Sequence, residues 1–260
     1  SFAGIFAFSP AVMVGESGDI RLLNPGEVVR VGREHLDIVV GVKVRVGLVA
    51  SGGIGVAPLD IAIEAAEALG LPVMAHLDHP PPSRLEVLSR LRPGDVLTHC
   101  YRPFPAAPTT ADGRVRDEVM AAKAKGVIFD IGHGKGSFSW QVAETMLAAG
   151  LPPDCISSDV HTMSALGPAF DQLVTMSKFL HLGQELSDIV RAVTDAPARA
   201  VGRPELGALT VGGPADATLL RIQEGAFPLT DASGVTVEAR RRFGLAGYVR
   251  EGVWRRPGEH

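Results

Sequence analysis

Two short apolar runs that end abruptly in histidine constrain the fold of this chain more than any other feature. Residues 72–76 lead to His76 and residues 95–99 lead to His99, each after turn-forming proline or glycine. Such runs are typical of parallel strands that are buried on both faces. A histidine at the carboxyl end of such a strand lies where alternating α/β folds place their chemistry. Two of them on consecutive strands indicate metal ligands. The alternative is a pair of hydrogen-bonded histidines near the rim of a barrel.

Strand-like and helical segments alternate along residues 1–203. We expect strands near residues 5, 42, 75, 98, 129 and 157. Helices between them are indicated by capping signals, such as Asn24 before Pro25 and Ser83 three residues before Glu86. About six β/α units fall short of the eight that close a (β/α)8 TIM-type barrel. The α/β chain is therefore either an open sheet or a barrel without two units. The sequence begins inside an apolar run, so we expect the missing units to be the first.

The pattern changes after residue 203, where short strands follow one another without helices. The expected strands are residues 208–211, 215–221, 227–231, 235–238 and 243–249. Ser233 and Gly234 supply a turn signal between two of them, which is typical of antiparallel pairing. We therefore expect two domains, an incomplete barrel at residues 1–203 and a small β-sandwich portion at residues 204–260.

Composition excludes several classes of function. The net charge of −4 is small and both signs are interspersed, which argues against a nucleic-acid surface. No apolar run approaches the ~20 residues that span a bilayer, and no basic segment opens the sequence as in a signal peptide. Cys100 and Cys155 form no disulfide framework and fit a reducing compartment. We expect a cytoplasmic protein without nucleic-acid or membrane partners.

Lys43 is the most informative single residue, because it interrupts an apolar run between two valines. Lysine is almost never buried without a partner, since its amine would have to lose its charge there. A neutral amine can capture CO2 and become an anionic carbamate. Together with His76, His99 and Asp159, such a group would hold divalent metal. The alternative is a structural ion pair of Lys43 with Asp130 or Asp159.

Several motifs, in their order and spacing, resemble the amidohydrolase superfamily, and most closely its deacetylase/dihydroorotase-like branch of metallohydrolases. The motifs are residues 41–45, His76, residues 97–100, 129–134, 158–161, 175–180 and 207–216. The resemblance covers nearly the whole chain. It implies a (β/α)8 barrel with two divalent metal ions, usually zinc, followed by the return of the chain into a β-sandwich.

The same resemblance implies a ligand set. Lys43 corresponds to the carbamylated lysine that bridges both metals, and His76 and His99 correspond to the ligands of one metal. Asp159 corresponds to the aspartate that binds the other metal and shuttles protons. The family's first-strand His-x-His pair is absent from this sequence. We therefore expect that the sequence lacks the amino-terminal part of the enzyme and that its metal site is incomplete.

These residues predict a hydrolase that cleaves an amide or ester, as a deacylase or deacetylase does, through a hydroxide generated by the metals. Asp159 is the predicted catalytic residue, first as general base and then as general acid. The alternatives are a cyclic amide hydrolase of the dihydroorotase or hydantoinase kind, a catalytically incomplete fragment, or a non-catalytic scaffold.

The substrate is less constrained than the reaction. Polar residues near strand ends could bind a carboxylate or orient a leaving group, although a structural role is an equal alternative for each. They are Arg45, His79, Arg102, His133 and His161. We expect a small-molecule acyl substrate, and the sequence is compatible with a homo-oligomer.

Overall fold

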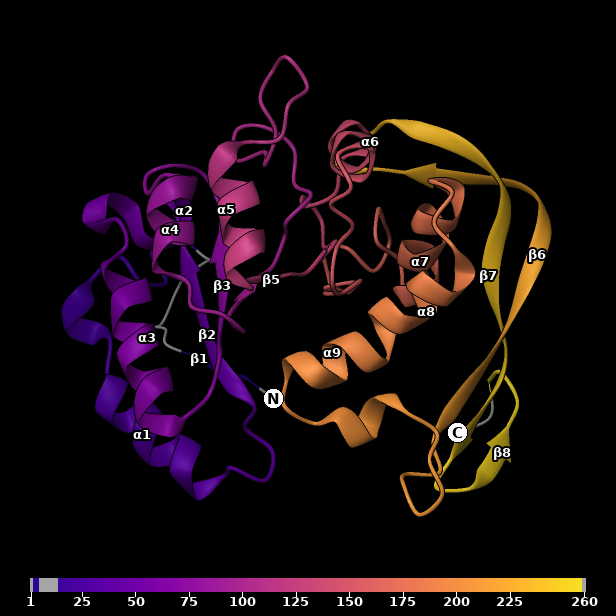
Figure 1. Cartoon of the computed structure of the whole chain (residues 1–260), viewed down its shortest axis with the longest axis horizontal. Coiled ribbons are helices and arrows are strands. Elements are labelled where there is room, and N and C mark those ends of the chain that lie inside the picture. Colours follow the sequence, from indigo (N-terminus) through magenta and orange to yellow (C-terminus); the bar gives the residue numbers. More distant parts are fainter. Residues whose placement is uncertain (1, 5–13, 259–260) are drawn as a thin grey trace. The chain divides into compact units, whose positions relative to one another are not determined.

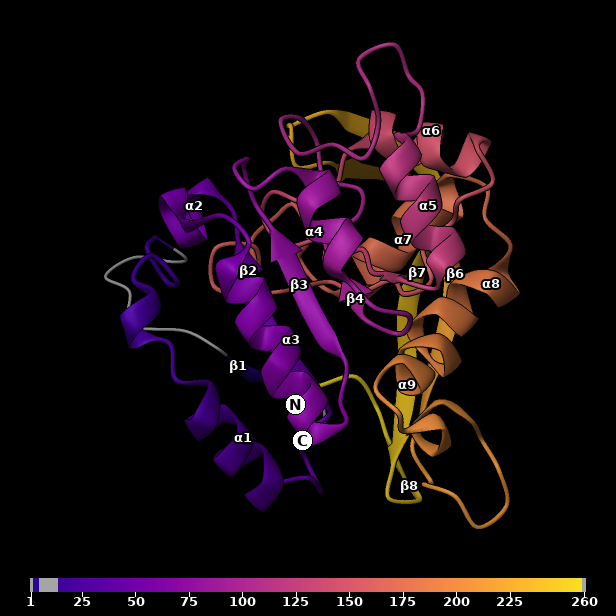
Figure 2. The ribbon, with the colours of Figure 1, turned by 60° about the vertical axis from the view of Figure 1, so that its left-hand side comes forward.

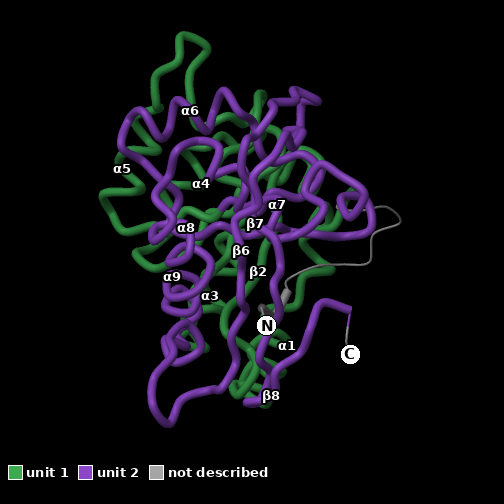
Figure 3. Tube along the Cα trace, turned by 90° about the vertical axis from the view of Figure 1, so that its right-hand side faces the viewer, with its two compact units in different colours: residues 1–130 green, residues 131–260 purple. Residues whose placement is uncertain are grey.

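The computed structural model of the chain describes residues 2–4 and 14–258. These fall into two compact units, residues 1–130 and residues 131–260, which are coloured separately in Figure 3. Each unit is described by itself. The expected domain boundary after residue 203 stays a prediction, and the part of the first expected strand beyond Gly4 lies outside the described residues.

The first unit is built on a five-stranded parallel sheet in which neighbours follow the chain order. Its strands are β1 (Phe2–Gly4), β2 (Gly41–Val46), β3 (Val73–Leu77), β4 (Val96–Leu97) and β5 (Ile128–Phe129). Five of the expected strands are thereby confirmed. Sequential order of parallel strands is the order found in the wall of a β/α barrel. Consecutive carboxyl ends therefore lie next to one another along one edge.

Helices cover one side of this sheet (Figures 1 and 2). They are α1 (Pro25–Glu34), α2 (Leu48–Ser51), α3 (Ala57–Leu69), α4 (Arg84–Arg90) and α5 (Asp117–Lys125), with 3-10 turns η1 (Ile20–Leu22) and η2 (Gly52–Ile54). The Ser83–Glu86 capping box forms as predicted and begins α4. In the described part of the chain, no single helix has the length and apolar character needed to cross a membrane. The bent pair Leu48–Ile54 and Ala57–Leu69 meets that criterion by length and composition only.

The second unit combines helices with a three-stranded antiparallel sheet. Its elements are α6 (Trp140–Ala148), α7 (Gln172–His181), α8 (Leu186–Val193), α9 (Asp195–Ala200), η3 (Pro204–Gly207), β6 (Ala217–Thr230), β7 (Thr236–Arg250) and β8 (Val253–Arg255). Helix α7 packs on β7, where the Phe243 backbone N–H donates to Ser177 Oγ at 2.9 Å.

Three sequence-based expectations for this unit were wrong. The run near residue 157 forms no regular strand; it is held by single bonds, such as His133 N–H to the Ser157 carbonyl at 3.1 Å. Residues 208–211 are not a strand either. The four remaining short strands merge into β6 and β7, because irregular register near Gly225 lets the ribbon bend without ending, as Figure 1 shows.

Candidate active site

The register between β2 and β3 places the predicted lysine and the first predicted histidine on the same face of the sheet. Lys43 pairs with Met74, and Arg45 pairs with His76. Side chains of paired residues point to the same face, and so do residues two apart on one strand. The valines that alternate with Lys43 are buried on the opposite face, whereas Lys43 and Arg45 are half-buried. The strand pairing therefore brings Lys43 and His76 to one face.

His76 and His99 form a buried pair. Their ring centroids are 4.4 Å apart, with the planes at 81°, and their exposed fractions are 5% and 6%. His99 lies just beyond β4 with a φ of 64°, a left-handed conformation that costs a side-chain-bearing residue about 1–2 kcal/mol. Strain of this kind persists where the surrounding structure enforces it, often at functional sites. The turned backbone gives the His99 ring its place against His76.

The electrostatics favour a neutral His76. Burial is the largest cause that lowers its pKa well below the usual value, and the charges of His99 and Lys43 lower it further. Its Nε2 atom is buried and has no hydrogen-bond partner among the described residues. An unprotonated nitrogen without a partner is the form of imidazole that coordinates a metal. His76 therefore fits a metal ligand better than a structural histidine, which would have a partner.

Among the described residues, no third conventional ligand completes this pair. Within residues 2–4 and 14–258, no group of three His, Cys, Asp or Glu side chains is placed to hold a metal ion. Lys43 is near enough to His76 to affect its pKa. The two imidazoles thus fit a metal with Lys43 as a further ligand only if its amine has become an anionic group.

The predicted aspartate belongs to the second unit. Asp159 is exposed and, like His99, has a positive φ of 44°. Its carboxylate lies against Gly134, where a Cβ atom would be 2.7 Å from Asp159 Oδ2. The Gly134 N–H also donates to the Ser158 carbonyl at 2.9 Å. The glycine after His133 therefore sets the space in which this carboxylate can lie.

Known proteins resemble both the sequence and the fold. No family model matches the chain. A deacetylase from Enterococcus faecalis is 35% identical over 231 residues, which are 88% of this chain and 63% of that protein. The crystal structure of an adenine deaminase matches with a TM-score of 0.94 and 32% identity, over 98% of this chain and 70% of that one. A dihydroorotase structure matches with a TM-score of 0.89 and 32% identity, over 97% and 70%.

The chain belongs to the amidohydrolase superfamily. The predicted resemblance to its deacetylase/dihydroorotase-like branch is confirmed, as is the α/β fold of its TIM-barrel members. These relatives are named as a deacetylase, an adenine deaminase and a dihydroorotase. This amidohydrolase chain spans 63% of the length of the Enterococcus deacetylase.

Three residues in the first unit of this amidohydrolase were predicted to bind substrate. Arg45 Nη1 forms an ion pair with Glu16 Oε1 at 2.8 Å, and His79 is exposed. Arg102 donates to the Leu77 carbonyl, and burial lowers the pKa of its guanidinium. Arg45 lies in β2, and His79 and Arg102 follow β3 and β4. The substrate-binding role of all three stays a prediction.

The two histidines predicted from the second unit differ in their surroundings. His161 is half-buried, and its Nδ1 accepts from the Met163 N–H at 3.3 Å. His133 is fully buried and stacks on Phe138, with ring centroids 5.1 Å apart. Its Nδ1 contacts the Gly134 carbonyl at 3.0 Å. Their roles toward substrate stay predictions.

Lys178 was not predicted, although it is the partner of His133. Its Nζ lies 2.5 Å from His133 Nε2, 3.1 Å from the Pro168 carbonyl and 2.6 Å from the Thr230 carbonyl. An ammonium has three donors, so all three contacts are satisfied when Nε2 accepts and Nδ1–H donates to Gly134. Burial lowers the pKa of Lys178 to about 7 and that of His133 to about 4. Lysine inside an amphipathic helix gave no sequence signal for this burial.

The sequence analysis also assigned no role to Asp78, because its interpretation of that segment rested on the neighbouring histidines. Its carboxylate accepts from the Val49 N–H at 3.1 Å and the Ala50 N–H at 3.0 Å, and so holds the start of helix α2, which follows β2. Gly47 has a φ of 135°, and a Cβ there would lie 2.1 Å from Asp78 Oδ1. The aspartate directly after the histidine strand was the available signal.

Proposed function

We propose that the complete protein is a metal-dependent hydrolase that removes an acyl group from an amide or ester. The observation that carries the proposal is the buried pair His76 and His99, with an unpartnered Nε2 on His76. The deacetylase relative at 35% identity supports the deacylase reading. A small-molecule acyl substrate follows from this reaction, and a cytoplasmic location remains part of the proposal.

The ligands we propose are Lys43, His76, His99 and Asp159, for two divalent ions of which zinc is our first choice. Lys43 would serve as a carbamate, which supplies the anion that two neutral imidazoles lack. When bound, divalent metal polarises a carbonyl and lowers the pKa of water to near neutrality. The neutral, buried state of His76 fits that role, because a protonated ring would repel the cation.

The side chains of the protein would then carry out proton transfer and orient the substrate. Asp159 holds the proton released by water and passes it to the leaving amine or alkoxide. Gly134 leaves room for its carboxylate. Arg45, Arg102 and His161 are proposed to orient the substrate. A carboxylate suits the proton-transfer step because it can serve as base and then as acid without leaving its position.

A cyclic amide hydrolase is the second candidate. The dihydroorotase structure, with a TM-score of 0.89 at 32% identity, favours it specifically. Ring opening of a cyclic amide uses the same chemistry, so the polar residues named above do not distinguish a deacylase from a cyclic amide hydrolase. Only the substrate that is hydrolysed distinguishes these two candidates.

The test is metal content and hydrolysis in the complete protein. Elemental analysis is expected to find two divalent ions per chain, and a panel of N-acetyl and O-acetyl acids is expected to be hydrolysed. Asp159→Asn should reduce kcat at least about 100-fold, whereas Asp171→Asn, at the cap of α7, should not. Faster turnover of dihydroorotate would favour the second candidate. If the complete protein contains no metal and hydrolyses none of these compounds, the result would favour a catalytically incomplete protein.

A further inference from the structure

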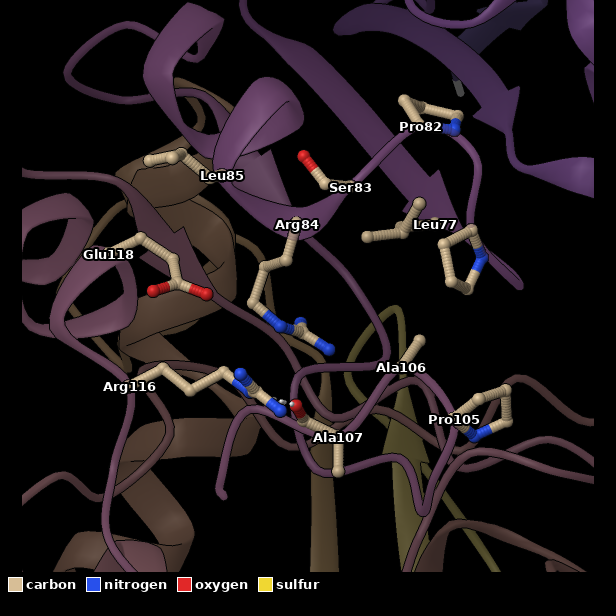
Figure 4. Close-up of a pocket in the computed structure, with 11 residues that line it drawn as sticks. Leu77, Pro82, Ser83, Arg84, Leu85, Pro105, Ala106, Ala107, Arg116 and Glu118 are labelled. Atoms are coloured by element: carbon tan, nitrogen blue, oxygen red, sulfur yellow. Dashed lines mark hydrogen bonds between the residues drawn. The ribbon is translucent and has the colours of Figure 1, made fainter. Parts of the chain in front are cut away.

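A cavity of about 210 Å3 lies in the first unit, between the segments that follow β3 and β4 and the first residues of α4 and α5. Its wall is shown in Figure 4 and combines small apolar residues with three charged side chains, Arg84, Arg116 and Glu118. Binding sites for drug-sized molecules have volumes of about 300–1,000 Å3. This cavity therefore suits a smaller molecule.

The cavity is separate from the candidate active site. Leu77, which forms part of its wall, is one residue beyond His76 on β3 and pairs with Val46 of β2. Successive residues of a strand point to opposite faces of the sheet. Leu77 therefore points to the face that the helices cover, whereas Lys43 and His76 share the other face. None of the four proposed metal ligands lines this cavity.

Arg84 is the unusual residue of the wall. It is the first residue of α4, and only 9% of it is exposed. Its Nη2 atom is buried and has no hydrogen-bond partner in the described part of the chain. Figure 4 shows its guanidinium directed into the space that the wall encloses. A buried charged donor without an acceptor loses its hydration without compensation, so an acceptor inside the cavity would stabilise it.

The charges around Arg84 also favour an anion. Burial lowers the pKa of Arg84 to about 10, and the charges of Arg102 and Arg116 lower it further, whereas Glu118 opposes the shift. The guanidinium therefore stays charged at neutral pH beside two other cations. Arg116 Nε donates to the Ala107 carbonyl at 3.3 Å, and among the described residues neither Arg84 nor Arg116 forms an ion pair. An anion in the cavity would reduce the repulsion between these arginines.

We propose that this cavity binds a short aliphatic carboxylate, such as butyrate, whose oxygens accept hydrogen bonds from Arg84. A guanidinium matches a carboxylate by two parallel hydrogen bonds. Much of the remaining wall is apolar, and its Leu77, Pro82 and Ala106 are buried, so it would contact a hydrocarbon chain. An inorganic anion such as phosphate would leave that part of the wall without a contact. The proposal does not depend on the hydrolase function, because the site lies apart from the metal ligands.

The test is calorimetric titration of the complete protein with butyrate and with 1-nitropropane, which have nearly the same shape and differ in charge. The unmodified protein is expected to bind butyrate about 10- to 100-fold more tightly. Arg84→Met should abolish this preference, and Arg84→Lys should restore only part of it, because lysine keeps the charge but lacks the planar fork. Arg114→Met, at an exposed arginine paired with Asp112, is the matched control.

Two further measurements locate the bound carboxylate. Ala106→Leu narrows the cavity without changing its charges, and it should weaken the binding of butyrate. Removal of metal with 1,10-phenanthroline should change the affinity for butyrate by less than about twofold, because the cavity faces away from Lys43 and His76.

A preference for butyrate that is lost in Arg84→Met, and kept in Arg114→Met and without metal, supports the proposal. Equal affinity for both probes overturns it, as does a preference that survives in a variant of Arg84 shown by circular dichroism to be folded. Loss of butyrate binding on metal removal also overturns it, because the carboxylate would then be bound at the metal centre. Phosphate that binds as tightly as butyrate would overturn the assignment to carboxylates. If Arg84→Met does not fold, Arg84→Lys and Ala106→Leu decide in the same way.

Discussion

The backbone has a left-handed conformation at His99 and at Asp159, the two predicted ligands that lie beyond regular structure. Among described residues, four side-chain-bearing positions have a positive φ: His99, Asp159, Phe170 and Glu251. Residues of this kind are uncommon outside glycine, and their strain is retained where the fold over-determines them. That two of the four are predicted metal ligands supports the assignment by an observation independent of residue type.

Gly134 gives a direct test at this scale. In Gly134→Ala, a Cβ would lie 2.7 Å from Asp159 Oδ2 at a φ of 49°, so the carboxylate must move. We expect kcat to fall at least about 10-fold, since misplacement of a catalytic group by 1 Å is costly. Steady-state kinetics of the complete protein measure it. Gly136→Ala is the control, because nothing lies within 4 Å of its Cβ; equal losses in both variants would contradict the argument.

Lys178 predicts a pH dependence of stability. Its pKa falls from 10.5 to about 7 on folding, mainly by burial, with the Asp231 carboxylate opposing. His133, the other titratable group that faces it, has its pKa lowered to about 4 and so stays neutral above pH 7. Between about pH 7 and 10.5 the unfolded chain binds more protons. The free energy of unfolding should therefore rise with pH, by at most about 1.4 kcal/mol per unit.

The measurement is urea unfolding at several pH values within that window. Lys178→Met should remove this part of the slope, whereas Lys135→Met, at an exposed lysine, should keep it. An unchanged slope in a folded Lys178→Met variant would show that the buried amine does not titrate there.

At the scale of elements, the start of α2 depends on the close approach of Gly47 to the carboxylate of Asp78. Gly47 has a φ of 135° and leaves no room for a Cβ beside Asp78, whose carboxylate satisfies two N–H groups in the first turn of α2. Gly47→Ala is therefore expected to destabilise the protein by about 1–3 kcal/mol. Chemical denaturation measures this effect. With open space around its Cβ, Gly53→Ala should stay within about 0.5 kcal/mol of the parent.

Sequence patterns predicted those elements whose signals are local. The β2 and β3 runs and the capping box at Ser83 follow from residue types within a few positions. Other features depend on distant partners. The left-handed turn at His99, the burial of Arg84 and the three contacts of Lys178 leave no local trace. Likewise, merging of short runs into β6 required a bulge that hydrophobic alternation does not reveal.

At the scale of the whole molecule, bound metal should stabilise the fold. His76 has a buried nitrogen without a partner among the described residues, so ligation would satisfy a group that the protein alone does not. A ligand that binds only the folded state raises stability by mass action. Treatment of the complete protein with 1,10-phenanthroline is therefore expected to lower Tm by several degrees, reversed by added Zn2+. An unchanged Tm after confirmed metal loss would argue against His76 as a ligand.

The contacts of Lys178 also bear on how this chain can be shortened or rebuilt. One acceptor of its ammonium is the carbonyl of Thr230, the last residue of β6. Deleting the β6–β7 ribbon would leave one N–H of the buried Lys178 ammonium without an acceptor, next to His133. A chimaera that exchanges this ribbon must therefore supply a backbone oxygen at the same place, or the loop beside Asp159 loses its support.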